Sequence, residues 1–306
     1  MMGLNTDSIV NLKSDVDEIV FSVVIVGYKK VEMVLECINS IYQFNDIGKK
    51  LEIILVDNSP EHHVYDAVMN MFDSVIGIKN VNNGFGAGNN LGAMQAKGKY
   101  LLFLNPDTIL IEPIFNFAIK KFDSNKDLGM FGVKMVSRNL SRNSSFYLVS
   151  GASILRSFFM KICNKLDFYL DKYMYVAGAN MFVRRTDFFK CGLFDENIFM
   201  YYEEPDLTNR LHAIDRYTAY FKDKKIIHLE GGTGSGGELA LRRRLDSAIY
   251  FNNKYSISPR NIFLREMRLN RLKLFIYKIF GFDVVNDIEL NIKVLAEYLK
   301  KIDEDS

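Results

Sequence analysis

The chain has 306 residues, of which 48% are hydrophobic and 25% are charged, which is ordinary for a globular protein with one large domain and an appendage. Its formal net charge of +2 is too small to favour nucleic acid as a partner. No uninterrupted apolar stretch approaches the roughly 20 residues that span a bilayer, and residues 1–20 are too polar for a secretory signal.

The cysteines indicate a reducing compartment. Cys37, Cys163 and Cys191 are odd in number, lie far apart and lack the spacing of metal ligands. We therefore expect free thiols in a cytoplasmic protein.

Buried strands and helices alternate in the first half of the chain. Apolar, β-branched runs predict strands, and apolar residues at helical spacing predict helices. The strands are expected at 21–26, 51–56, 75–79 and 100–104, and the helices at 31–42 and 89–97. This alternation predicts an α/β fold with a mostly parallel sheet flanked by helices.

In a sheet of this kind, ligands bind beyond the carboxyl ends of the strands. Three polar segments follow predicted strands and should converge on that edge: Gly27–Tyr28, Asp57–Asn58 and Asn105–Pro106–Asp107.

The second half is less regular. Strands are expected at 129–136, 173–184 and 219–229, a helix at 203–213, and helices from Leu239 onward with a break at Gly281. The segment 137–172 has weak periodicity and is expected to be a loop that orders over substrate. The predicted domains are a polar N-terminal extension (1–20), a catalytic domain (21–255) and a helical appendage (256–306).

An acidic cluster is the strongest chemical signal. Tyr201 to Leu207 holds three carboxylates, Glu203, Glu204 and Asp206, and Arg210 follows one turn later. A solvated helix start would explain such a run, but so would a site that takes up a proton and binds a hydroxylated substrate.

Two further polar residues follow apolar runs. Asp107 is a hard anionic ligand that suits Mg²⁺ or Mn²⁺, and His228 could complete such a site, although a lone histidine is usually structural.

The glycine-rich loop at 82–90 resembles a nucleotide-binding loop only in part. No Gly-Lys-Ser/Thr follows, and Leu91 occupies the third glycine position of the dinucleotide fingerprint. The loop is either a tight turn that caps a helix or a place where the backbone approaches a ligand closely.

Taken in this order, the motifs resemble the family-2 glycosyltransferases of the GT-A fold, in particular the rhamnosyltransferase-like branch of bacterial polysaccharide synthesis. The segments that carry the resemblance are 22–26, 55–59, 82–86, 104–107, 178–185, 194–196 and 202–210.

The resemblance implies a role for individual residues. Asp57 matches the acidic residue that recognises the base and ribose, and Asp107 the metal-binding Asp of the Asp-x-Asp signature. Glu204 matches the general base, with Glu203 beside it, and His228 matches a metal ligand. The other residues implied are donor-binding Asn58, Asn83, Gly84, Asn90 and Asn105, with Asp206 and Arg210 as acceptor-binding or supporting residues.

The activity implied is sugar transfer with inversion, dependent on Mg²⁺ or Mn²⁺. The donor would be dTDP-rhamnose, otherwise a UDP-hexose. The acceptor would be a saccharide or a polyprenyl-diphosphate-linked glycan in O-antigen or capsule synthesis. The alternatives are a nucleotidyltransferase that makes nucleotide-sugars and a catalytically dead binding module.

The C-terminal appendage suits an anionic membrane surface. Arg265, Arg268, Arg271 and Lys273 alternate with large apolar residues. We expect peripheral attachment to the inner face of the cell membrane. The alternative is a helix that packs on the catalytic domain or in a homodimer.

Overall fold

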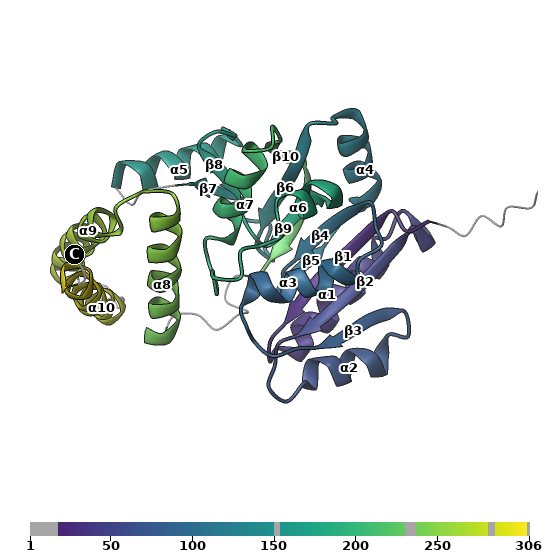
Figure 1. The fold of residues 1–306 in the computed structure, drawn as a ribbon, viewed down its shortest axis with the longest axis horizontal. Helices are drawn as coiled ribbons and strands as arrows, with labels where there is room; N and C mark the ends of the chain where they lie inside the picture. The colour runs from purple at the N-terminus through teal and green to yellow at the C-terminus, as the bar shows by residue number, and fades with distance from the viewer. Residues whose placement is uncertain (1–17, 150–153, 230–236, 281–284, 305–306) are drawn as a thin grey trace, which may run out of the picture.

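The computed structural model describes residues 18–149, 154–229, 237–280 and 285–304 (Figure 1). The predicted N-terminal extension therefore lies almost wholly outside the described residues. The glycine-rich turn after His228 and the break at Gly281 also lie outside them.

The domain predicted at 21–255 is built on an eight-stranded sheet with the order β3-β2-β1-β4-β9-β6-β10-β5. Strands β9 and β5 run antiparallel to their neighbours and the other strands are parallel to one another, which confirms the predicted fold class. The strands are β1 (Phe21–Gly27), β2 (Leu51–Asp57), β3 (Val75–Lys79), β4 (Tyr100–Leu104), β5 (Thr108–Leu110), β6 (Leu128–Val136), β9 (Asn180–Arg184) and β10 (Tyr217–His228).

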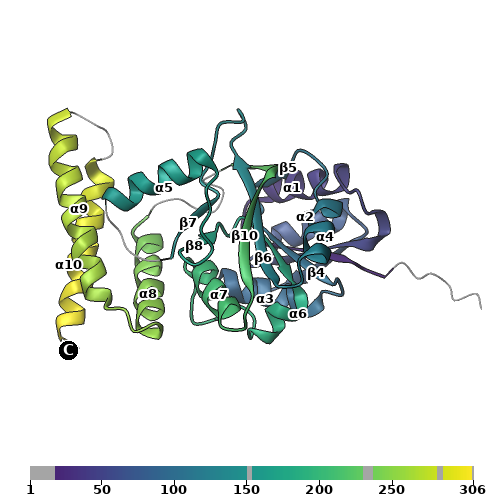
Figure 2. The same cartoon turned by 90° about the horizontal axis from the view of Figure 1, so that it is seen from above.

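Helices cover both faces of this sheet (Figure 2). Successive side chains of a strand point to opposite faces. Val23 and Ile25 of β1 pack in one core with α1, α2 and α4, whereas Val24 packs in a second core with α3, α6 and α7. The helices of the domain are α1 (Val31–Gln43), α2 (His63–Met71), α3 (Phe85–Gln95), α4 (Phe115–Ser124), α6 (Arg185–Lys190) and α7 (Glu203–His212), with a short 3₁₀ turn at Gly48–Lys50.

The segment 137–172 is not a loop, so that prediction is wrong. It contains α5 (Ile154–Leu166) and β7 (Phe146–Leu148), and β7 pairs antiparallel with β8 (Met174–Val176). Phe146, Cys163 and Met174 form a small separate core that holds these elements together. The expected strand at 173–184 is accordingly divided into β8 and β9.

Helix α3 begins at Phe85, earlier than predicted. Gly84 has φ +116°, and a Cβ at this position would lie 2.5 Å from the carbonyl oxygen of Phe199. The Phe85 N–H donates to that same oxygen at 2.9 Å. Only glycine allows the chain to pass this close to the Phe199 backbone. The glycine-rich loop therefore begins α3 and, through the hydrogen bond to Phe199, also joins this helix to the segment before α7.

The C-terminal helices α8 (Glu238–Lys254), α9 (Pro259–Phe280) and α10 (Val285–Glu304) share a core of their own. The segment of α8 was predicted to belong to the domain at 21–255, but α8 packs with α9 and α10 in a bundle beside the sheet and its helices (Figure 1). Both views place one end of α5 next to α9. Within the described ranges, no helix combines the length and the low polarity that a membrane span requires.

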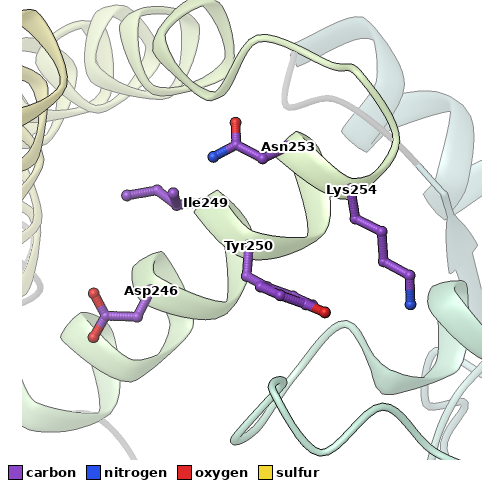
Figure 3. A pocket seen from close by; sticks show the side chains of 5 residues that line it. All are labelled: Asp246, Ile249, Tyr250, Asn253 and Lys254. Atoms are coloured by element: carbon purple, nitrogen blue, oxygen red, sulfur yellow. The ribbon is translucent and has the colours of Figure 1, made fainter. Parts of the chain in front are cut away.

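Helix α8 contacts the domain that contains the sheet. A hollow of about 460 Å³ on this helix is lined by residues of α8 alone (Figure 3). Two of them, Tyr250 and Lys254, bond to Asp195 of the catalytic domain at 2.9 and 2.6 Å. Burial would raise the pKa of Asp195, but these hydrogen bonds and those from Asn197 lower it to about 2. Tyr250 and Lys254 therefore hold α8 against the rest of the protein.

Candidate active site

The carboxyl ends of β1, β4 and β10 meet at a cavity of about 270 Å³. Val26 and Asn105 line it from β1 and β4, and His228 lines it from β10. Glu203 and Glu204 enter from the start of α7 on the opposite side. The ends of β1, β2 and β4 lie at one edge as predicted, because these strands are adjacent and parallel, but of the three predicted polar segments only Asn105 and Pro106 line the cavity. Of the acidic cluster, Glu203 and Glu204 line it.

Asp107 lies next to His228, which lines this cavity. Thr108 pairs with His228 across the β5–β10 ladder, and the Leu229 N–H donates to the Asp107 carbonyl at 2.9 Å. His228 Nε2 is 3.4 Å from Asp107 Oδ1. The prediction that these two residues meet at one edge is therefore confirmed, whereas their role in binding metal stays a prediction.

This group of side chains fits a divalent cation. Asp107 Oδ1, His228 Nδ1 and Asn105 Oδ1 are buried polar atoms without a hydrogen-bond partner among the described residues. Native proteins rarely leave such atoms unpaired, and carboxylate, amide and imidazole groups are ligands of Mg²⁺ and Mn²⁺.

In the part of the chain that the structure describes, no three His, Cys, Asp or Glu side chains gather closely enough to hold a metal ion. A divalent cation at Asp107 and His228 would therefore need further oxygen ligands, such as water.

The carboxylate pair sits on a strained backbone. Tyr201 and Tyr202 both have left-handed φ angles, +67° and +73°, directly before α7 begins. Two consecutive non-glycine residues in this conformation each cost on the order of 1–3 kcal/mol, and such strain clusters at functional sites. It turns the chain so that Glu203 and Glu204 both point into the cavity.

The two carboxylates have different surroundings. Glu203 is 2% exposed, and its Oε1 has no partner among the described residues. Burial, and then the charge of Glu204, raises the pKa of Glu203 well above its usual value. Burial also raises the pKa of Glu204, but a hydrogen bond from the Gly178 backbone opposes this. Two adjacent buried carboxylates resist ionising together, so the negative charge of the pair is favoured on Glu204.

Gly178 contacts Glu204, although the motif at 178–185 predicted no role for this residue. A Cβ at this position would lie 2.2 Å from Glu204 Oε1. The residue must be glycine for its backbone to contact the carboxylate. The contact joins residues 26 positions apart, so no local pattern could have predicted it. Tyr147 also lines the cavity, but it lies in the segment that was expected to be a loop.

The predicted nucleotide-recognition residues follow β2. Asp57 is fully buried, and its two oxygens accept the Ser59 and Tyr65 N–H groups, both at 2.8 Å. Asn58 accepts from Asn80 at 2.8 Å and donates to the Gly84 carbonyl at 3.3 Å. These bonds fix the chain at the ends of β2 and β3. The role of Asp57 and Asn58 in donor binding stays a prediction.

The other predicted donor-binding residues lie apart from one another. Asn83 is exposed next to Gly84, whereas Asn90 is buried inside α3. The Asn90 amide donates to the Phe194 carbonyl and to Glu196 and accepts the Phe194 N–H, all at 2.9 Å. It holds the loop after α6, and Asn105 alone of this group lines the cavity.

Asp206 and Arg210 hold helix α7 in place through hydrogen bonds. Asp206 is fully buried and accepts from Arg210 Nε at 2.8 Å, Lys254 Nζ at 2.6 Å and the Tyr255 hydroxyl at 2.9 Å. Arg210 also donates to the carbonyls of Cys191 and Leu193. This network ties α7 to the preceding loop and to α8, and neither residue lines the cavity.

The sheet order and its polar edge define an α/β fold of the GT-A type. The family model "Glycosyl transferase family 2" matches residues 22–191, more than half of the chain, and the chain belongs to this family.

Three known proteins illustrate the similarity. Rhamnosyltransferase WbbL of Escherichia coli strain K12 is 33% identical over 144 residues, which are 42% of this chain and 54% of that protein. The chain thus matches about half the length of this curated relative.

Among solved structures, the mannosyltransferase PcManGT from Pyrobaculum calidifontis, in complex with GDP-Man and Mn²⁺, has a TM-score of 0.57 at 13% identity, over 90% of this chain and 75% of that one. TarS of S. aureus has a TM-score of 0.52 at 17% identity, over 76% of this chain and 40% of that one. At these identities the likeness shows the fold alone.

We predict that the raised pKa of Glu203 makes the free energy of unfolding fall as the pH rises. Its pKa in the folded protein is raised above the usual 4.5, so between pH 4.5 and that raised value the unfolded chain releases a proton that the folded chain retains. The free energy of unfolding should fall over this range by up to about 1.4 kcal/mol per pH unit. Glu203→Gln removes this titration, so its stability relative to wild type should increase with pH.

Urea unfolding at a series of pH values from 4.5 upward measures this difference. Glu32→Gln, which changes an exposed carboxylate on α1, is the control and should follow wild type. Parallel profiles for wild type and Glu203→Gln would show that Glu203 is not held protonated by the fold.

Proposed function

We propose that the protein is an inverting glycosyltransferase that moves a sugar from a nucleoside diphosphate to an acceptor hydroxyl. One observation carries the proposal: Glu204 and His228 line the same cavity, and His228 lies 3.4 Å from the buried carboxylate of Asp107. A base on one side and a diphosphate-binding edge on the other are what a direct displacement at an anomeric carbon requires.

Glu204 takes the proton of the acceptor hydroxyl as its oxygen attacks the anomeric carbon. The new C–O bond forms on the face opposite the leaving group, and the bond to the donor phosphate breaks with its electron pair, so the configuration inverts. The raised pKa makes Glu204 a stronger base than an exposed glutamate, and Gly178 and the strained Tyr201–Tyr202 backbone hold it in position. A divalent cation held by Asp107 and His228 would neutralise charge on the diphosphate.

The proposed donor is dTDP-rhamnose, with UDP-hexoses second. The name of the Escherichia coli relative supports rhamnose, and its partial coverage leaves the sugar a proposal. In this proposal Asp57 contributes to base recognition by holding the 58–65 segment, and Asn58 and Asn105 contribute from the strand ends. The acceptor would belong to a bacterial surface polysaccharide such as O-antigen or capsule.

Two other functions use the same residues. A nucleotidyltransferase would be expected to have a glycine-rich, basic segment after β1, and Gly27 is followed there by Tyr28, Lys29 and Lys30 with no further glycine. A dead binding module would bind nucleotide-sugar without hydrolysing it. Release of nucleoside diphosphate above the uncatalysed rate excludes the module, and release of pyrophosphate would indicate the nucleotidyltransferase.

We predict that Glu204→Gln lowers the turnover number by about 100-fold or more and leaves the Kd of the nucleotide-sugar unchanged, because the amide cannot accept the proton. Turnover with dTDP-rhamnose and UDP-hexoses, and calorimetric binding of the same donors, measure the two effects. Glu204→Asp retains a carboxylate and should keep more activity than Glu204→Gln. Near-normal turnover in Glu204→Gln together with collapse in Glu203→Gln would assign the base to Glu203 instead.

We also predict that transfer requires Mg²⁺ or Mn²⁺. Mn²⁺ added with nucleoside diphosphate should raise the melting temperature of wild type, and Asp107→Asn or His228→Ala should remove most of this increase because each loses a ligand. Asp171→Asn is a matched control, since Asp171 and His212 form another Asp–His pair, 2.9 Å apart, outside the cavity. Full activity after exhaustive chelation would exclude a metal-dependent mechanism.

A membrane surface is the proposed location of the reaction. Leu272, Phe275, Ile276 and Ile279 are exposed at helical spacing on α9, and Phe158 and Leu166 are exposed on α5, one end of which lies beside α9. Arg265, Arg268 and Arg271 are exposed on α9 as well. Apolar residues flanked by basic ones fit an anionic bilayer surface.

We predict that wild type co-sediments with anionic vesicles at low salt. Replacing Arg265, Arg268 and Arg271 with Gln should weaken binding roughly 100-fold, because each basic residue near such a surface is worth about 1 kcal/mol. Phe275→Ser with Ile279→Ser should also weaken it. Met71→Ser, an exposed apolar change on α2, is the control and should have no effect. Wild type that stays in the supernatant would assign the exposed face to protein packing.

A further inference from the structure

One lysine of the C-terminal bundle contacts both ends of the segment that carries the proposed base. Lys254, the last residue of α8, donates through Nζ to Asp195 Oδ2 and to Asp206 Oδ1, both at 2.6 Å. Asp195 comes before the strained turn, and Asp206 lies in the first turn of α7. A single ammonium group therefore joins the two ends of segment 195–206.

The middle of segment 195–206 also contacts α8. The ring of Tyr202 lies 5.1 Å from the ring of Phe251 and packs against the core of the bundle. Tyr202 has a left-handed φ of +73°, so a residue in an unfavourable conformation is also the one whose side chain packs on the bundle. Farther back, the Phe199 carbonyl accepts the Phe85 N–H of α3 at 2.9 Å. Contacts from α3 and α8 thus hold a backbone shape that local preferences oppose.

The charges around Lys254 favour this bridge. Asp206 is fully buried, and its other oxygen accepts from Arg210 Nε at 2.8 Å. Tyr250 extends from the same helix and donates to the same Asp195 oxygen as Lys254 (Figure 3). Burial would lower the pKa of Lys254, but the hydrogen bonds to Asp195 and Asp206 raise it. The lysine therefore stays charged, and without it a buried carboxylate would lose one of its two cations.

Lys254 can affect the base only through the chain that it holds. It does not line the cavity that Glu204 and His228 share. If the bridge were absent, the backbone at Tyr201 and Tyr202 could relax toward ordinary φ angles. Such a relaxation would turn Glu204 away from the cavity and break its contact with Gly178.

We propose that Lys254 is a positioning residue for sugar transfer. By joining Asp195 to Asp206 it keeps the strained Tyr201–Tyr202 turn in place, and this turn directs Glu204 into the cavity. The C-terminal bundle thereby contributes to the reaction through a residue that does not touch the substrates. This inference rests on the proposed function, in which Glu204 is the base, and adds the group that fixes its direction.

The test measures hydrolysis of dTDP-rhamnose and of UDP-hexoses, which needs no acceptor. The oxygen of water bonds to the anomeric carbon, Glu204 takes the proton, and the bond to the donor phosphate breaks with its electron pair. Lys254→Gln should lower turnover about 10- to 100-fold, because a base displaced by roughly 1 Å can cost that much. The KM of the donor should not change, because the strand ends that would hold the donor are intact.

The pH dependence of turnover distinguishes positioning from a general loss of stability. Burial raises the pKa of Glu204, and a base must be ionised to act, so turnover should decline as the pH falls below that pKa. In Lys254→Gln the carboxylate gains contact with water and its pKa falls toward the ordinary 4.5. The acid limb of the profile should therefore move to lower pH. Lys254→Arg keeps the charge and can donate to both carboxylates, so it should restore turnover and the acid limb.

Hydrogen exchange with mass spectrometry checks the segment itself, independently of activity. Peptides that cover 195–206 should exchange faster in Lys254→Gln than in wild type, whereas peptides of α1 should not change. Lys278→Gln is the matched control, because it breaks an ion pair of the same length, 2.6 Å to Glu289, within the same bundle. It should equal wild type in turnover, pH profile and exchange.

Asp195→Asn is a milder variant that breaks only one end of the bridge. It should move the acid limb in the same direction with a smaller loss of turnover, and it decides the question if Lys254→Gln does not fold.

Three results would overturn the inference: a folded Lys254→Gln with the turnover and acid limb of wild type, a raised KM with turnover unchanged, or a Lys278→Gln that matches Lys254→Gln. Wild type that hydrolyses none of the donors would instead contradict the proposed function. In that case exchange over 195–206 still shows whether Lys254 holds the segment, and equal exchange in Lys254→Gln and wild type would reject that role as well.

Discussion

A single buried carboxylate, Asp206, holds the catalytic helix in its place. It has no exposed surface, yet it accepts hydrogen bonds from Arg210, Lys254 and Tyr255, which come from α7 itself and from the end of α8. Removing one partner of a buried ion pair costs about 3–5 kcal/mol, because the remaining charge is left without compensation. Helix α7 therefore cannot shift without losing its contacts to α8, and the C-terminal bundle becomes part of the framework of the active site.

Two carboxylates in the first turn of α7 have opposite surroundings. Asp206 has cations on two sides, whereas Glu203 is equally deep and has an oxygen without a partner among the described residues. The Tyr201–Tyr202 backbone before them is strained. Natural proteins tolerate such local cost where activity depends on it, and the surrounding structure supplies the stability. Here the stabilising group, Asp206, and the destabilising group, Glu203, lie within one helical turn.

Sequence reasoning succeeded where the determining interactions are local. Apolar, β-branched runs identified β1, β2 and β4, which are buried along nearly their whole length and are therefore mostly apolar. They also identified β3, an edge strand of which only Val75 is buried. It failed for α5 and β7, whose core partner Met174 is remote in the chain. The predicted start of α3 was too late because the turn at Gly84 depends on its close approach to Phe199, which is remote in the sequence. The prediction therefore did not show that the Asn90 side chain points into the protein.

The same distinction applies to the site. Asp107 and His228 could be placed together because each follows an apolar run that ends at the same edge of the sheet. The contact of Gly178 with Glu204 depends on a distance that no local pattern contains. The Asp57 bond to the Ser59 N–H is a local turn, but the sequence could not show that both Asp57 oxygens are occupied by backbone N–H groups. Motif matching grouped these residues as a set but could not say which of them line the cavity and which hold the framework.

The division of the two cavities has a consequence for how such chains diverge. Within the described residues, α8 and α9 contribute nothing to the cavity at the ends of β1, β4 and β10, and these strands contribute nothing to the second cavity, of about 540 Å³, between the start of α7 and helices α8 and α9. Tyr147, Tyr201 and Glu204 line both cavities. Related chains can therefore differ in α9 with the first cavity unchanged, whereas a substitution at any of the three shared residues alters both.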